Sequence, residues 1–219
     1  DAIQAEHVAP AITQLLSDAE AALARAVSAE VPADYDALSL VLDVATERLG
    51  RAWGAISHLN AVANTAEIRA AYNEHLAAVT GFYTQLGAHT GLYAKYKAID
   101  ESTLTAEQQQ ALKNARRNFV LSGADLTGEA KERFAKIQER QAELGQKFSE
   151  NALDATDAFS LYVTADELDG VPADVIAATR AAAEAEGRDG HKLTLKMPCY
   201  LPVMQFGKRS DLREKLYRA

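Results

Sequence analysis

Cysteine and long apolar runs are nearly absent from this sequence, and each shortage excludes a class of protein. Cys199 is the only cysteine among 219 residues, so the chain cannot form an internal disulfide. One free thiol suits a reducing compartment, and we predict a cytoplasmic protein. No apolar run approaches the roughly 18 residues that a membrane-spanning helix needs, so we expect no membrane partner. The first residue is Asp1, with no methionine and no signal peptide, and we expect a chain that was processed or trimmed.

Positive charge is also in short supply. The sequence has 23 lysine and arginine residues against 31 aspartate and glutamate residues, a net charge of −8. A protein that binds nucleic acid needs a basic face to neutralise phosphates, so we expect no nucleic-acid partner. The charge is uneven, because residues 196–219 contain six basic and two acidic side chains, a net of +4, which leaves −12 for the rest. This basic end either docks onto an acidic surface or is an ordinary solvated helix end.

Proline is scarce, at 5 residues, and alanine is abundant, a composition that favours helices. Apolar residues recur every three or four positions, and N-cap residues (Asp34 or Asp36, then Thr65 and Thr105) precede several of these stretches, while Gly123 is a predicted C-cap. The short breaks between the stretches favour antiparallel neighbours in a bundle. We predict helices over 5–28, 34–64, 65–86, 91–99, 105–122 and 127–157.

The pattern changes after residue 158. Residues 159–164 and 192–197 alternate and contain β-preferring side chains, so we predict two short strands that pair with each other. A helix from Pro172 to about residue 186 lies between them, an irregular apolar stretch bracketed by Pro198 and Pro202 follows, and Ser210 begins a last helix. The predicted fold class is mostly α: an antiparallel helical bundle with one small two-stranded β element. The predicted domains are a helical bundle over 1–157 and, over 158–219, the strands with their inserted helix and the start of the next helix.

The histidines do not have the spacing of a metal site. A helical zinc protease site needs two histidines four residues apart, and a di-iron bundle needs a glutamate three residues before a histidine. Neither spacing occurs among the five histidines, His7, His58, His75, His89 and His191. The adjacent pairs at 6–7 and 74–75 also point about a quarter turn apart on a helix. We therefore favour surface or hydrogen-bonded structural roles for His7 and His75.

Other reactive side chains also favour structural roles. Ser57 and His58 are neighbours on one predicted helix with no third orienting group, so we favour a hydrogen bond between helices over a nucleophile. Cys199 lies in an apolar, proline-flanked stretch, where a buried inert thiol is expected. Tyr93 and Tyr96 are expected to be half-buried packing residues. The predicted set of catalytic, cofactor-binding and metal-binding residues is therefore empty.

Several stretches, taken in order, resemble the N-terminal half of the thimet oligopeptidase and oligopeptidase A family of zinc metallopeptidases. No single piece is a catalytic motif, and the specificity of the resemblance comes from the common order of the pieces. The closest run is LGQKF at 144–148 followed by NALDAT at 151–156. The other matching segments are 6–12, 57–60, 67–69, 91–96, 117–119, 121–126, 193–195, 200–204 and 212–219, with Val62, Asn64, Tyr72 and Pro198.

The resemblance implies a large helical enzyme that hydrolyses short peptides in a channel between two halves. It implies a zinc ion in the second half, held by an H-E-x-x-H helix, where zinc activates a water molecule. The present sequence ends before such residues, and its last helix carries no C-cap signal, so we expect truncation before the catalytic domain. The expected function is a non-catalytic wall of the substrate channel, inactive and metal-free by itself. Its expected partners are short peptides, through the intact enzyme, and the missing C-terminal catalytic domain.

Two other interpretations stay open. The chain could be a stand-alone helical interaction module without enzymatic activity, which a gene ending at Ala219 would support. It could also be a bundle that binds a metal or cofactor through its scattered histidines, and metal analysis of the purified chain tests that interpretation.

Overall fold

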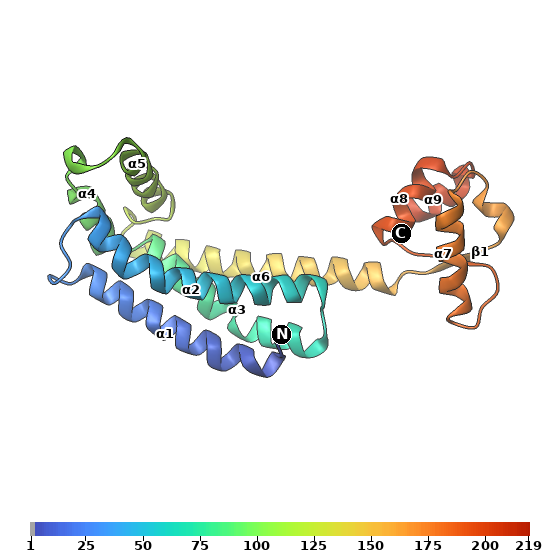
Figure 1. The fold of residues 1–219 in the computed structure, drawn as a ribbon, viewed down its shortest axis with the longest axis horizontal. Helices are drawn as coiled ribbons and strands as arrows, with labels where there is room; N and C mark the ends of the chain where they lie inside the picture. Colours follow the sequence, from blue (N-terminus) through green and yellow to red (C-terminus); the bar gives the residue numbers. More distant parts are fainter. Residues whose placement is uncertain (1–2) are drawn as a thin grey trace. The chain divides into compact units, whose positions relative to one another are not determined.

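The computed structural model describes residues 3–219 and consists of helices apart from one small sheet (Figure 1). The chain divides into two compact units, Asp1–Leu144 and Gly145–Ala219. The predicted fold class, mostly α with a single two-stranded β element, is confirmed. Within residues 3–219, no helix is both long enough and apolar enough to cross a membrane.

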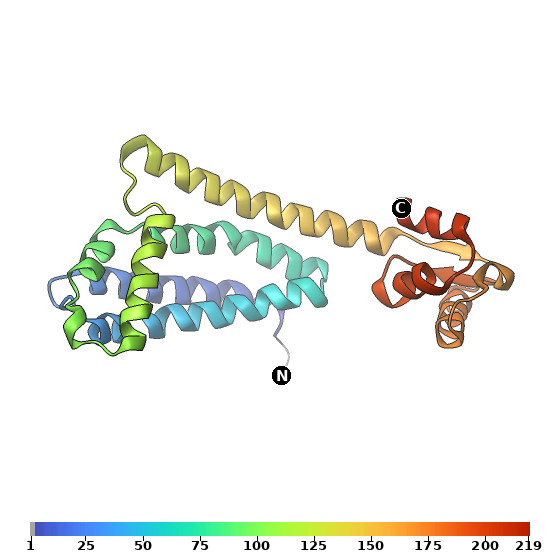
Figure 2. The same cartoon turned by 90° about the horizontal axis from the view of Figure 1, so that it is seen from above.

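The first unit is built from long helices and short 3-10 turns. In chain order these are η1 (Ala5–His7), α1 (Val8–Val27), α2 (Tyr35–Val62), α3 (Ala66–Gly87), α4 (Thr90–Ala98), η2 (Glu101–Thr103), α5 (Ala106–Leu121) and the first part of α6 (Gly128–Ala158). Helices α1, α2 and α3 lie side by side and alternate in direction, as Figures 1 and 2 show. The predicted helices of this region are confirmed, with bounds that differ by a few residues.

The helix ends form where the sequence supplies capping groups. Asp34 caps α2 by accepting a hydrogen bond from the Ala37 N–H at 2.9 Å. Thr105 and Gln108 cap α5 reciprocally, through backbone-to-side-chain hydrogen bonds of 3.0 and 3.3 Å. Gly123 adopts a φ of +87° just after α5, a left-handed conformation that favours glycine. The capping roles predicted for these residues are confirmed, with Asp34 chosen over its alternative Asp36.

The core of the first unit lies between α1, α2 and α3 and extends to α4 and α5. Its side chains repeat every three or four residues along each helix, so each helix turns one apolar face inward. The large members that are nearly inaccessible to solvent are Val8, Ile12, Leu23, Leu38, Leu42, Leu49, Ile56, Val79, Phe82, Leu92 and Leu112. Burial of this set is what holds the bundle together, because a fully buried aliphatic or aromatic side chain stabilises a fold by about 1.5–3 kcal/mol.

Two lysines tie distant parts of the first unit to backbone carbonyl groups. The Lys95 ammonium group, on α4, donates to the carbonyl oxygens of Ser28 and Val31 in the connection between α1 and α2. The Lys131 ammonium group, on α6, donates to the Ala88 carbonyl oxygen at 2.7 Å. Both contacts satisfy carbonyl groups in connections between helices, which have no partner within a helix.

The second unit combines a two-stranded sheet with short helices. Its elements are the C-terminal part of α6, then β1 (Leu161–Val163), η3 (Ala165–Leu168), α7 (Ala173–Glu184), β2 (His191–Leu193), α8 (Met197–Phe206) and α9 (Ser210–Arg218). The strands pair antiparallel, with Leu161 opposite Leu193 and Val163 opposite His191. A separate core fills this unit, made of Val163, Leu168, Val171, Leu193, Val203, Leu212 and Leu216.

Residues 197–206 differ from the sequence prediction. A strand was expected over 192–197 and irregular backbone after it, but the second strand ends at Leu193 and residues 197–206 form helix α8. Pro198 lies in the first turn of α8, where a missing N–H removes no hydrogen bond. Pro202 lies inside the helix and lacks the N–H that would bond the Pro198 carbonyl, a cost that this short helix tolerates.

Candidate functional site

Two histidines act as helix-capping groups. The His7 Nδ1 atom accepts a hydrogen bond from the Gln4 N–H at 3.0 Å, at the start of the chain's first helical turn. The His89 Nδ1 atom accepts from the Leu92 N–H at 3.1 Å and so caps α4. Both nitrogens are engaged by the backbone of their own segment, and both side chains therefore have a local structural role.

Two further histidines are buried and also bond locally. The His75 Nδ1 atom lies 3.0 Å from the Ala71 carbonyl oxygen, one turn earlier in α3. The His191 Nδ1 atom, on β2, lies 3.2 Å from the Thr179 hydroxyl group and 3.1 Å from the Ile176 carbonyl oxygen, both on α7. Across residues 3–219, no group of three or more histidine, cysteine, aspartate or glutamate side chains is placed to hold a metal ion.

The side chains considered as nucleophiles do not meet a base. The Ser57 hydroxyl group donates to the Trp53 carbonyl oxygen at 2.8 Å, one turn back in α2, and His58 is largely exposed. The hydrogen bond of Ser57 therefore stays within its own helix and does not join two helices. The Cys199 thiol is half-buried and lies 3.4 Å from the Thr194 N–H, so it is less buried than the sequence suggested.

A pocket of about 270 Å³ opens where α2, α3, α4 and α5 meet. Its floor is apolar and includes Leu92 and Phe119, while Asp43 and Tyr96 supply polar groups. Burial raises the pKa of Tyr96 to about 12, with smaller contributions from the negative charge of Asp43 and from Tyr35. The Tyr96 ring packs on Phe119 with 5.2 Å between ring centroids, so it is a partly buried packing residue, as predicted.

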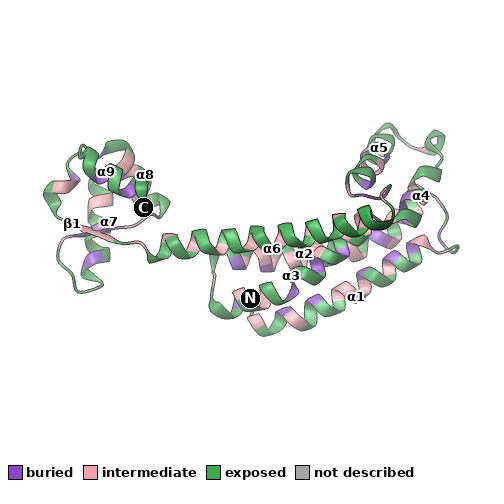
Figure 3. Cartoon of the chain, turned by 180° about the vertical axis from the view of Figure 1, so that it is seen from behind, coloured by how far each residue is buried: buried purple, intermediate pink, exposed green. Residues whose placement is uncertain are grey.

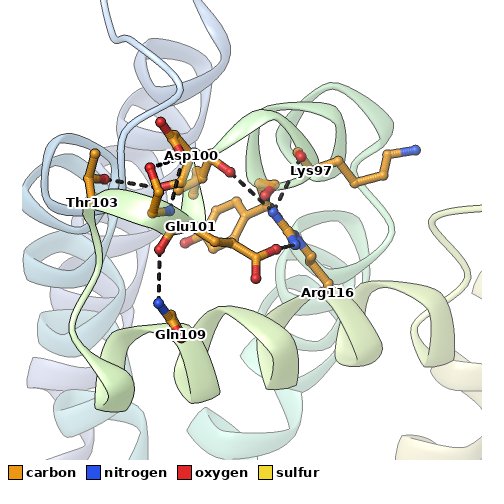
Figure 4. A network of polar contacts seen from close by, with 9 residues as sticks. Lys97, Asp100, Glu101, Thr103, Gln109 and Arg116 are labelled. Carbon is orange, nitrogen blue, oxygen red and sulfur yellow. Dashed lines mark hydrogen bonds and ion pairs between the residues drawn. The ribbon is translucent and has the colours of Figure 1, made fainter.

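Arg116 organises the corner between α4 and α5 (Figure 4). Its guanidinium group donates to the carbonyl oxygens of Tyr96 at 2.9 Å, Lys97 at 3.3 Å and Ile99 at 3.4 Å. The same group forms an ion pair with Glu101. A planar guanidinium group has five donors in a fixed fork, which lets one side chain satisfy several carbonyl groups at a helix end. Composition and periodicity gave no signal for this residue, because its partners are backbone atoms.

A polar cluster fixes the corner between α2 and α3. The Asn64 side-chain nitrogen donates to the Asn60 side-chain oxygen at 2.9 Å, and the Arg69 Nε atom donates to the Asn64 side-chain oxygen at 2.7 Å. Nearby, the rings of Trp53 and Tyr72 stack with 4.6 Å between centroids. These residues lie in or beside the segments that carry the family resemblance, so that part of the resemblance corresponds to a structural corner.

A groove of about 530 Å³ runs between α3 and the N-terminal part of α6. Small residues line the α3 side, among them Ala77, Gly81 and Ala88. Phe134 lies on the α6 side, flanked by charged residues that include Glu139. The groove shows that α6 leaves a gap of this size on the side that faces α3.

Three large apolar side chains of α6 are exposed, on the helix that is mostly green in Figure 3. Ile137, Leu144 and Phe148 are 47%, 49% and 75% exposed and lie at intervals of seven and four residues. We call these three residues the α6 stripe. Helical periodicity predicted this helix through the same residues, but it could not indicate that these three side chains stay exposed among residues 3–219.

The apolar residues of α8 divide into two sets. Val203 is fully buried, and Tyr200 and Met204 pack against the core of the second unit. Met197 and Phe206 are more than half exposed. The surface of this unit therefore also contains uncovered apolar side chains, at the two ends of α8.

The comparison with protein families decides the relationship. The family described as "Neurolysin/Thimet oligopeptidase, N-terminal domain" matches residues 12–131, more than half of the chain. The chain belongs to this oligopeptidase family. The matched range covers most of the first unit, including the core helices α2 and α3 and the Arg116 corner. The resemblance detected in the sequence is thereby confirmed.

Curated members of this oligopeptidase family are similar over the whole chain. "Oligopeptidase A" of Salmonella typhimurium is 41% identical over 223 residues, which cover 100% of this chain and 33% of the relative. "Oligopeptidase A" of Escherichia coli is 40% identical over 98% of this chain and 32% of the relative. "Probable cytosolic oligopeptidase A" of Arabidopsis thaliana is 36% identical over 100% and 33%. The chain therefore spans about a third of the length of these relatives and corresponds to an N-terminal portion of an oligopeptidase A.

Proposed function

We propose that this chain is the non-catalytic N-terminal part of an oligopeptidase A-like enzyme that hydrolyses short peptides. The observation that carries the proposal is the 41% identity to an oligopeptidase A over the full length of the chain. In this proposal the helices of the first unit form one wall of the channel that admits the peptide. Support comes from their rigid packing, since a wall must hold its shape while substrates enter and leave.

The metal chemistry is proposed for the enzyme as a whole. A zinc protease site needs three protein ligands and an open position for water. The side chains of residues 3–219 do not provide such a set, so they do not fit a resident zinc ion. We propose that the zinc ligands and the catalytic base belong to the C-terminal catalytic domain, the principal partner of this chain, and that this chain by itself is inactive.

The proposed compartment is the cytoplasm. The single thiol of Cys199 suits a reducing environment, and one Arabidopsis relative carries the name of a cytosolic enzyme. The division into a helical domain over 1–157 and a smaller domain over 158–219 stays a prediction.

The experiment that tests this function compares the chain with the whole protein encoded by its gene. Both are purified and incubated with a short quenched-fluorescent peptide, with and without a metal chelator. We expect hydrolysis by the whole protein, loss of that hydrolysis with the chelator, and no hydrolysis by the 219-residue chain. Chelator-resistant cleavage by the 219-residue chain would contradict the proposal, as would a whole protein without peptidase activity.

A stand-alone helical interaction module is the second candidate function. The exposed α6 stripe favours it, because an uncovered apolar face is also what a separate binding partner would recognise. This candidate requires that the gene encode no catalytic segment after Ala219. A reading frame that continues into an H-E-x-x-H segment would dismiss it.

A further inference from the structure

Helix α6 is amphipathic over 31 residues, yet none of its residues is buried. Its most exposed apolar side chain is Phe148, at 75%, and Leu144 lies one turn before it. Residues seven and four positions apart share one face of a helix, so Ile137 completes a continuous stripe with them. Because all three side chains belong to one helix, their common face follows from helix geometry alone.

The other faces of α6 show what a solvated or a packed face looks like on the same helix. Phe134, Gln138 and Ala142 are half-buried. A different face carries exposed charged side chains, among them Lys136, Glu139 and Glu143. Arg140 borders the stripe and forms an ion pair with Glu143, with both partners mostly exposed. The α6 stripe belongs to neither class, because its residues are apolar like a packed face and exposed like a solvated one.

Exposure of this stripe has a free-energy consequence. A leucine, isoleucine or phenylalanine side chain gains about 1.5–3 kcal/mol when it moves from water into a packed interior. Contiguous exposed apolar surface with a polar border is typical of an interaction site. The stripe therefore has the properties of a surface that another polypeptide segment covers.

We propose that the α6 stripe is the docking site for the C-terminal part of the oligopeptidase polypeptide. This part corresponds to the two thirds of the relatives' length that the present chain does not match. This inference rests on the proposed function. The inference specifies where the C-terminal part docks: it covers Ile137, Leu144 and Phe148 and leaves the charged face of α6 in water.

Area and charge favour this occupant over a second copy of the chain. A stable interface between separate proteins buries about 800 Å² on each partner, far more than three side chains expose. A segment of the same polypeptide needs less contact area, because covalent connection gives it a high effective concentration. Two copies of this chain, each with a net charge of −8, would also repel each other.

The test measures whether a thiol placed on the stripe is covered. Cys199→Ala removes the cysteine of this sequence, and any cysteine in the rest of the whole protein is replaced by alanine as well. Phe148→Cys or the control Glu143→Cys is introduced into this cysteine-free background. Glu143 lies five residues away, about 140° around the helix axis, on the charged face. The rate of maleimide labelling is measured in the 219-residue chain and in the whole protein encoded by the gene, and peptide hydrolysis is measured on the same whole-protein samples.

In the 219-residue chain we expect both cysteines to react at the rate of an exposed thiol. In the whole protein we expect labelling of Phe148→Cys to slow by roughly 100-fold, and labelling of Glu143→Cys to change by less than about threefold. A whole protein that hydrolyses peptide but labels both cysteines equally fast would overturn the inference and leave the proposed function intact. If Phe148→Cys were protected in a whole protein that does not hydrolyse peptide, the proposed peptidase function would be refuted, although the stripe would still be covered.

The 219-residue chain also distinguishes a second copy as the occupant. Protection of Phe148→Cys that grows with protein concentration in this chain alone would show self-association through the stripe and would overturn the inference. Rapid labelling at every concentration agrees with it.

Discussion

Helices α2 and α6 have the same kind of sequence pattern and opposite surroundings. Both are long and amphipathic, with 28 and 31 residues. Along α2, Leu38, Leu42 and Leu49 are almost inaccessible, whereas α6 has no buried residue and its Ile137, Leu144 and Phe148 face water. The difference teaches that periodicity in a sequence identifies a face that some segment covers, without indicating which segment.

The largest expected effect contrasts the two helices directly. Leu49→Ala removes a fully buried side chain from the bundle, and we expect the free energy of unfolding to fall by about 2–5 kcal/mol. Phe148→Ala in the same 219-residue chain is expected to change it by less than about 0.5 kcal/mol, because the ring already faces water. Urea unfolding monitored by circular dichroism measures both. Equal losses in the free energy of unfolding for the two variants would contradict the expected difference between α2 and α6.

The next effect concerns the corner that closes the bundle. Arg116→Ala leaves the carbonyl groups of Tyr96, Lys97 and Ile99 without their donor, and we expect a loss of about 1–3 kcal/mol. Arg116→Lys should restore only part of this stability, since an ammonium group lacks the planar fork. Urea unfolding measures the loss, and the exposed neighbour Arg117→Ala is the matched control. If Arg117→Ala were as unstable as Arg116→Ala, the hydrogen bonds from Arg116 to these carbonyl groups would not be the cause of the loss.

Glycine substitutions should change stability in opposite directions. Gly123→Ala forces a side chain into a φ of +87°, with Leu126 only 3.0 Å from the new Cβ atom, and we expect a loss of about 1 kcal/mol or more. Gly145→Ala, in the interior of α6, meets nothing within 4 Å and should stabilise the chain by about 0.5–1 kcal/mol. Thermal melting of each variant measures the signs. A stabilising Gly123→Ala would show that the turn does not need its left-handed residue.

The smallest expected effect on stability at neutral pH is that of the ionisation of Tyr96 in the first unit. Burial raises its folded-state pKa to about 12 from the ordinary value of 10.0, so the stability that this group contributes is fully present below pH 10. That stability is lost as the pH rises from about 10 through about 12. Spectrophotometric titration of tyrosinate should show a late ionisation step that Tyr96→Phe removes. Tyr217→Phe, which alters an exposed side chain of α9, should leave the step in place. A late step that survives in Tyr96→Phe would assign it to another tyrosine.

Much of the fold was predictable because its determinants are local. Asp34, Thr105 and Gly123 act within three residues of their own positions, and the helices they bound were predicted to within a few residues. Helix α8 was missed because proline at 198 suggested irregular backbone, whereas a proline in the first turn is compatible with a helix.

The candidate site was predicted less completely. Arg116 binds backbone carbonyl groups 17–20 residues away, a partnership that side-chain patterns do not encode. The apolar residues of α6 were visible in the sequence, but their exposure depends on which segments of the chain reach them. The resemblance, by contrast, rested on the order of short matches along the whole chain, and the family comparison confirmed it.

The cations at the corners of the first unit have a bearing on how it tolerates acid. Arg116, Lys95 and Lys131 all donate to peptide carbonyl oxygens. Aspartate and glutamate lose their negative charge when the solution is acidified, and ion pairs with them disappear. A peptide carbonyl oxygen does not titrate in that range, so these three side chains keep their hydrogen-bond acceptors. The first unit should therefore retain these connections between its helices in acidic solution, after its surface ion pairs have been lost.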